Sequence, residues 1–266
     1  MTDLVGTGID ALDAFLKGGL PRGFTSLLLA PSGAGAEIFA KQFCVGNPGD
    51  KVAYVTTDES ANEVRQAAKD AKWNFEHVEI IDLQTEFAES MMATQEKRRP
   101  SSDKARVDAR RLVDGADSLD FLRRPGQGPA GQSEPHRDVD YLQRLVSVQS
   151  RMRPPDRVVV HSLDFFLNHH SLEEVVSALT AIKAATSRNG GLALWILSKG
   201  AHGVAAERRL ELLADCLLEL EVTRKGTTFE RFFMVKKVKN RAYGIGVSTY
   251  DITQQGFLLE TLERIV

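Results

Sequence analysis

Short apolar runs alternate along the chain with segments in which apolar residues recur every three or four positions. The apolar runs predict buried strands over residues 24–29, 51–57, 77–83, 157–160 and 192–198. Helical periodicity occupies residues 38–45, the segment after Ser60, residues 141–152 and residues 175–187. This alternation predicts βαβ units and a mostly parallel sheet with helices on both faces. Three later runs, 216–223, 229–238 and 246–252, lack intervening helices and predict antiparallel strands at the C-terminal side.

The alternation lapses over residues 94–138. This segment carries basic clusters at 97–99, 110–111 and 123–124, the run GQGPAGQSEP, and few large apolar residues. Such a composition cannot bury much apolar surface and is typical of a flexible segment. We therefore predict one α/β domain over residues 1–266 with a flexible insertion at 94–138.

The composition, net charge and cysteine count of the chain exclude some classes of function. Of the 266 residues, 42% are hydrophobic, which is enough for one sizeable core. The net charge of −2 gives no basic field of the kind that drives non-specific DNA binding. The two cysteines, Cys44 and Cys216, lie in apolar segments and read as buried thiols, which disfavours a cysteine metal site. The N-terminus lacks a signal pattern and no run is long enough to span a bilayer, so we expect a cytoplasmic protein without membrane contact.

The stretch FTSLLLAPSGAGAEIFAKQF, residues 24–43, predicts a strand, a glycine-rich turn and a helix. The phosphate loop G-x-x-x-x-G-K-[ST] has this plan: its glycines let backbone N–H groups surround phosphates, its lysine contacts the β- and γ-phosphates, and its hydroxyl binds Mg²⁺. On that template Ala30 stands for the first glycine and Gly35 for the second. Ala36 and Glu37 occupy the lysine and hydroxyl positions. The backbone plan of the loop is therefore present without its charges.

Several further motifs, in this order and spacing, resemble the KaiC-like branch of the RecA superfamily, which is common in archaea. They are TGIDALD at 7–13, GGLPRG at 18–23, YVTTDES at 54–60, RVVVHSL at 157–163, ADCLLEL at 214–220, VKKVK at 235–239 and YDITQQG at 250–256. The resemblance covers nearly the whole chain outside the insertion. It implies a RecA-like three-layer sandwich that binds ATP between subunits, often in a ring.

The resemblance also implies a set of site residues. The degenerate nucleotide-binding loop comprises Ser32, Gly33, Ala34, Gly35, Ala36 and Glu37. The Walker B position falls on His161 and Ser162, and the acidic pair of the family on Asp58 and Glu59. A basic pair, Lys237 and Lys239, corresponds to residues that contact the nucleotide of the neighbouring subunit.

Three of these positions lack the expected chemistry. Ala36 removes the cation that would pair with phosphate oxygens. A carboxylate at Glu37 is stabilised by the helix N-terminus and repels a phosphate there. His161 stands where an aspartate would organise Mg²⁺, a cation that prefers oxygen ligands. Phosphoryl transfer depends on positioning and electrostatics, so we do not expect this subunit to catalyse it.

Two pairs keep alternative interpretations. Asp58 and Glu59 are vestigial catalytic candidates, since a glutamate here polarises the attacking water in the family, but they also favour the N-terminus of the following helix. Lys237 and Lys239 fit either a subunit interface or a solvated strand face.

Three hypotheses follow. The first is a catalytically degenerate regulatory or scaffold subunit that assembles with itself or with an active paralogue. The second is an ATP-binding protein or slow ATPase with an atypical loop. The third is a DNA recombination or repair accessory protein that uses residues 94–138, a segment that also suits protein partners. No cofactor is obligatory, ATP remains open, and neither Mg²⁺ nor another metal is expected.

Overall fold

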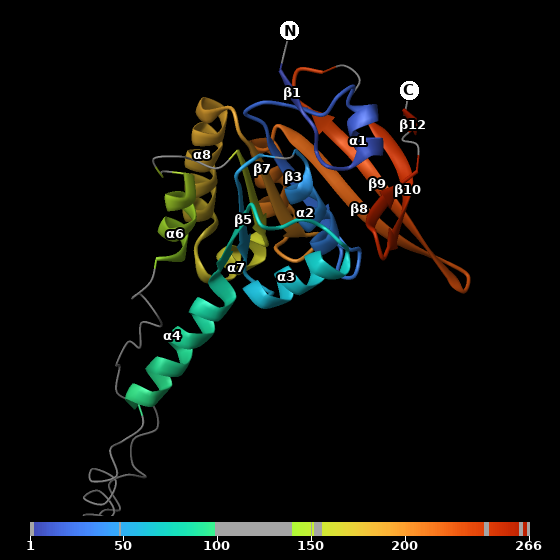
Figure 1. The fold of residues 1–266 in the computed structure, drawn as a ribbon. Helices are drawn as coiled ribbons and strands as arrows, with labels where there is room; N and C mark the ends of the chain where they lie inside the picture. Colours follow the sequence, from blue (N-terminus) through green and yellow to red (C-terminus); the bar gives the residue numbers. More distant parts are fainter. Residues whose placement is uncertain are drawn as a thin grey trace, which may run out of the picture. The chain divides into compact units, whose positions relative to one another are not determined.

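The computed structural model describes residues 3–47, 49–98, 140–149, 151, 156–241, 245–260 and 263–264 (Figure 1). The chain divides into two units, residues 1–84 with 141–266, and residues 85–140. The first unit contains the sheet and the candidate site.

Six neighbouring strands of the large sheet are parallel, as the alternating pattern predicts. These strands are β3 (Thr25–Ala30), β4 (Val52–Thr56), β5 (Val78–Asp82), β6 (Arg157–His161), β7 (Leu192–Ser198) and β8 (Cys216–Lys225). They lie in the order β5-β4-β6-β7-β3-β8. Every neighbouring pair in that order is parallel, so the carboxyl ends of these strands share one edge of the sheet.

The sheet continues with antiparallel strands on the C-terminal side. These are β9 (Thr228–Val238), β10 (Gly246–Thr253) and β11 (Gly256–Leu259), with the short β12 (Glu263–Arg264) beside β10. The predicted fold class, a mostly parallel α/β sheet with antiparallel C-terminal strands, is confirmed. A separate small sheet pairs β1 (Leu4–Val5) with β2 (Leu20–Pro21), which the sequence pattern did not predict.

Helices pack on both faces of the sheet (Figure 1). One face carries α1 (Asp10–Phe15), α2 (Ala36–Val45) and α3 (Ala61–Asp70), and the other carries α6 (Tyr141–Gln149), α7 (Leu163–His169) and α8 (Leu172–Asn189), with α9 (Val204–Leu213) against α8. Under α2 the ring of Phe39 stacks on Phe233 at 5.7 Å and meets Phe257 edge-on at 5.2 Å. These aromatic contacts join the phosphate-loop helix to the antiparallel strands.

Local signals fixed several helix starts. Ser60 with Glu63, and Ser171 with Glu174, form complete capping boxes at α3 and α8. Helix α2 begins at Ala36, two residues before the apolar periodicity that starts at residue 38. Helix α9 begins at Val204, directly after Gly203. Helix α7 has no clear periodicity of its own and was not predicted. None of the helices in the described part of the chain is long and apolar enough to cross a membrane.

Helix α4 (Leu83–Arg98) begins in the last two residues of the first unit's N-terminal part, and the structure describes the second unit over the rest of this helix and at Asp140. The helix covers the first residues of the segment predicted as an insertion. The remainder, 99–138, lies outside the described residues, so the flexible insertion stays a prediction.

A buried arginine joins the N-terminal loop to the sheet. Arg157 at the start of β6 is fully buried, and its guanidinium donates to Asp50 at 2.7 Å, to the carbonyl of Phe43 at 3.2 Å and to that of Gly6 at 2.6 Å. The same group lies over the Phe43 ring. A buried charge is tolerated when it is paired and hydrogen-bonded in this way.

Arg157→Met should therefore destabilise the domain by about 3 kcal/mol, since it strands the Asp50 carboxylate and two carbonyls. Urea denaturation followed by circular dichroism measures the change. Arg151→Met is the matched control: Arg151 pairs with Glu79 at the surface, where an ion pair contributes at most about 1 kcal/mol. Equal losses from the two variants would contradict the assigned role of Arg157.

Candidate functional site

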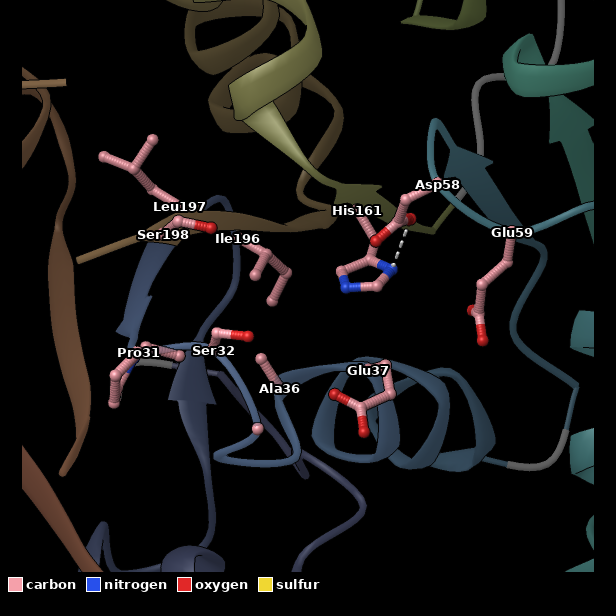
Figure 2. Close-up of a pocket in the computed structure, with 12 residues that line it drawn as sticks. Pro31, Ser32, Ala36, Glu37, Asp58, Glu59, His161, Ile196, Leu197 and Ser198 are labelled. Carbon is pink, nitrogen blue, oxygen red and sulfur yellow. Dashed lines mark ion pairs between the residues drawn. The ribbon is translucent and has the colours of Figure 1, made fainter. Parts of the chain in front are cut away.

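A cleft of about 220 Å³ opens at the carboxyl ends of β3, β4, β6 and β7 (Figure 2). Its wall combines the loop after β3 with the residues that end the three neighbouring strands. The lining residues are Ala30, Pro31, Ser32, Gly33, Ala36, Glu37, Asp58, Glu59, His161, Ile196, Leu197 and Ser198. The carboxyl edge of a parallel sheet is where α/β proteins place their ligand sites. Most of the residues predicted from sequence therefore meet in one place.

The loop after β3 has the backbone of a phosphate loop. Gly33 and Gly35 adopt positive φ angles of 77° and 85°, and Gly35 caps α2 without a side chain. The buried carbonyl of Ala34 accepts a 2.7 Å hydrogen bond from the hydroxyl of Tyr250 on β10. Burial raises the pKa of Tyr250 to about 12, so this phenol remains a donor at neutral pH.

The helix N-terminus that follows faces the cleft without a cation of its own. Ala36 and Glu37 form the first turn of α2, where backbone N–H groups lack intrahelical acceptors. Such a terminus attracts anions, and here the anion is the carboxylate of Glu37. In Figure 2, Glu37 lies below His161 and to the right of Ala36.

The residue predicted at the Walker B position, His161, is a buried histidine. His161 ends β6 with 5% of its surface exposed, and its Nδ1 lies 3.2 Å from Oδ1 of Asp58, an ion-pair distance without hydrogen-bond geometry (Figure 2). Ser162 does not line the cleft; its N–H donates to Oγ1 of Thr57 at 2.8 Å. The part of the chain described here contains no group of three or more His, Cys, Asp or Glu side chains that could hold a metal ion.

Glu59 is held by a cation that the sequence reading overlooked. The ammonium of Lys41 on α2 donates to both carboxylate oxygens of Glu59, at 2.8 and 2.6 Å. Lys41 is 2% exposed, whereas a quarter of the Glu59 side chain is exposed. Thr56 fixes the backbone of Glu59, since its hydroxyl donates to the Glu59 carbonyl and accepts from the Glu59 N–H. The sequence signal was a lysine among the buried apolar positions of α2.

The balance of charge in the cleft is acidic. Glu37, Asp58 and Glu59 line it, against Lys41 behind Glu59 and His161 beside Asp58. The effect extends into the core. The pKa of fully buried Tyr54 is raised well above its usual value, first by burial, then by Glu59, and to a smaller extent by Cys44, Asp58 and Glu37.

The predicted basic pair contacts its own chain. Lys237 on β9 donates to the carbonyls of Glu211 and Ala214, at 3.1 and 2.6 Å, at the end of α9. Lys239 lies 3.4 Å from the carboxylate of Asp215. These contacts do not test a role at a subunit interface, which stays a prediction.

The contribution of the Lys41–Glu59 pair to the free energy of unfolding can be measured. Lys41→Met should destabilise the domain by about 2–3 kcal/mol, because it leaves the largely buried Glu59 carboxylate unpaired. Lys41→Met/Glu59→Gln should recover most of that loss, since the pair is then replaced by uncharged side chains of similar size. Urea denaturation of the two single variants and the double variant gives the coupling, and purely additive losses would contradict a direct pair.

Comparisons with known proteins agree with the fold and the motifs. A protein-family model described as "ATPase: KaiC" matches residues 5–116. A UPF0273 protein from Methanopyrus kandleri is 36% identical over 80 residues, 28% of this chain and 31% of that protein, so the chain aligns with under a third of this curated relative. The crystal structure of a KaiC-like protein from Pyrococcus horikoshii superposes with a TM-score of 0.65 at 18% identity, covering 98% of this chain and 100% of that one, which shows a shared fold.

Proposed function

We propose that this chain, which resembles KaiC-like domains of the RecA superfamily in its motifs and fold, acts as a regulatory or scaffold subunit whose own nucleotide site is catalytically degenerate. The observation that carries the proposal is the acidic lining of the cleft. Where a phosphate loop would place a lysine and a hydroxyl, this cleft has Ala36 and the carboxylate of Glu37. The phosphates of a nucleoside triphosphate would be repelled by Glu37 at the loop, where a lysine and a hydroxyl normally supply most of the binding energy.

Asp58 and Glu59, the two residues that would support hydrolysis, already have partners within the chain. His161 contacts Asp58, and Lys41 occupies both oxygens of Glu59. A general base must have a free lone pair directed at the proton it removes, and a carboxylate that already accepts two charge-assisted hydrogen bonds is a weak one. This arrangement supports a subunit that does not hydrolyse ATP by itself.

We propose that the function is exercised in an oligomer, with copies of itself or with an active paralogue. Lys237 and Lys239 are the residues that would contact a neighbour's nucleotide. Their present acceptors are two backbone carbonyls and Asp215, and roughly half of the Lys239 side chain is exposed. Lysine side chains on flexible stems can exchange such acceptors for phosphate oxygens at little cost.

A second candidate is an ATP-binding protein that relies on backbone groups. It is favoured by the loop geometry, since Gly33 and Gly35 hold the positive φ angles that direct N–H groups around a phosphate. The same cleft would be used, with the adenosine outside it. The DNA-accessory hypothesis depends on residues 94–138, most of which lie outside the described residues, and it stays a prediction.

Calorimetry with ATP and ADP, each with and without Mg²⁺, separates the first two candidates. The wild type should show no binding at millimolar nucleotide, whereas Ala36→Lys/Glu37→Thr should bind, because it replaces one negative charge in the cleft with a positive one and a hydroxyl. Glu37→Gln alone is the control for the loss of repulsion. Micromolar binding by the wild type, abolished by Gly35→Arg, would overturn the proposal in favour of the second candidate.

A further inference from the structure

The position of Lys41 on α2 places a second lysine within reach of the cleft. It follows the vacant lysine position, Ala36, by five residues, so its Cα lies about 7.5 Å further along the helix axis. Long side chains on a helix lean back toward its N-terminus, which here is the phosphate loop. That tendency favours the end of α2 that faces the cleft, and the ammonium of Lys41 pairs with Glu59.

The carboxylate of Glu59 connects that ammonium to the cleft lining. Glu59 lines the cleft, and both of its oxygens lie within 2.8 Å of Nζ of Lys41. In Figure 2 the Glu59 side chain extends toward α2. A carboxylate that receives two hydrogen bonds from one ammonium resembles two oxygens of a phosphate group in charge sign and geometry.

Two other basic side chains near the cleft, Lys199 and His161, differ from Lys41 in their surroundings. Lys199, next to the lining residue Ser198, binds the buried carboxylate of Glu219 at 2.5 Å and is 36% exposed. His161 has its Nδ1 beside Asp58, half of whose side chain is exposed. Lys41 alone among these three is both fully desolvated and paired with a residue that faces the cleft. A desolvated ammonium exerts a stronger field than an exposed one.

Packing of α2 against the core does not require a charged residue at position 41, and so does not explain the Lys41–Glu59 pair. The other buried members of α2 are Ala36, Phe39, Ala40, Phe43 and Cys44, all apolar or weakly polar. A buried ion pair costs as much in desolvation as it returns, and apolar side chains of the same volume serve stability equally well.

We propose that Lys41 is a latent phosphate-binding lysine, and that Glu59 masks it by acting as a built-in anion. The ligand class is an oligophosphate, such as the phosphate chain of a nucleotide, which would replace the Glu59 carboxylate at Nζ. This inference rests on the proposed function, in which the wild-type site does not bind nucleotide, and it adds the contact that keeps the site closed.

The test is calorimetric titration of inorganic tripolyphosphate into four forms of the full chain, with EDTA present and at about 0.15 M salt. Glu59→Gln unmasks Lys41 and should bind at least about tenfold more tightly than the wild type. Lys41→Met/Glu59→Gln should lose that gain. Glu230→Gln is the matched control, because it also removes a lysine-paired carboxylate; Glu230 pairs with the exposed Lys225 and does not line the cleft, so this variant should stay within about threefold of the wild type.

Each result decides the question. No gain in Glu59→Gln, an equal gain in Glu230→Gln, or a gain that survives the loss of Lys41 would overturn the masking role while the proposed function stands. Tight binding by the wild type would overturn both. If Glu59→Gln is unfolded alone, its folding by millimolar tripolyphosphate, followed by circular dichroism and absent in Lys41→Met/Glu59→Gln, supports the proposal, and failure to fold opposes it.

Discussion

Parallel pairing of β3 with β7, of β7 with β6 and of β6 with β4 places four strand ends at one edge of the sheet, and every feature of the candidate site depends on it. Residues as distant in sequence as Ser32, Asp58, His161 and Ser198 line one cleft for that reason alone. The strands are buried on both faces, which fixes their register through packing. Arg157 adds to this by tying the start of β6 to the N-terminal loop and to α2.

The electrostatics of the cleft differ from what its backbone would suggest. Two positive φ glycines and a helix N-terminus make an anion-binding frame. The side chains added to that frame are mostly acidic; Lys41 pairs with Glu59 within the chain, and the His161 ring lies beside Asp58. A site that satisfies its own charges needs no ligand to be stable, which suits a subunit that contributes structure to an assembly. The same internal pairing makes the cleft sensitive to single substitutions, because each removed partner leaves a charge exposed to a ligand.

The contacts of the C-terminal strands bear on how such a subunit could take part in an assembly. The Tyr250 hydroxyl donates a hydrogen bond to the carbonyl of Ala34, and this bond joins β10 to the loop after β3. Lys237, on the neighbouring strand, is connected to the end of α9. A neighbour that draws Lys237 away would disturb α9 and the antiparallel strands together.

Sequence alone determined the α/β class, the order of most strands and helices, both capping boxes and the identity of the loop. These depend on local periodicity and on residues close together in the chain, such as Ser60 with Glu63. It also predicted that Ala36, Glu37 and His161 lack the chemistry of a phosphate site, which stays a prediction. The sequence could not give α7, whose seven residues lack a periodic pattern, or the partners of the site residues. That Lys41 holds Glu59, that His161 faces Asp58 and that Lys237 binds its own α9 were decided only by the tertiary structure, because strand pairing and helix packing bring together residues whose spacing in sequence carries no signal.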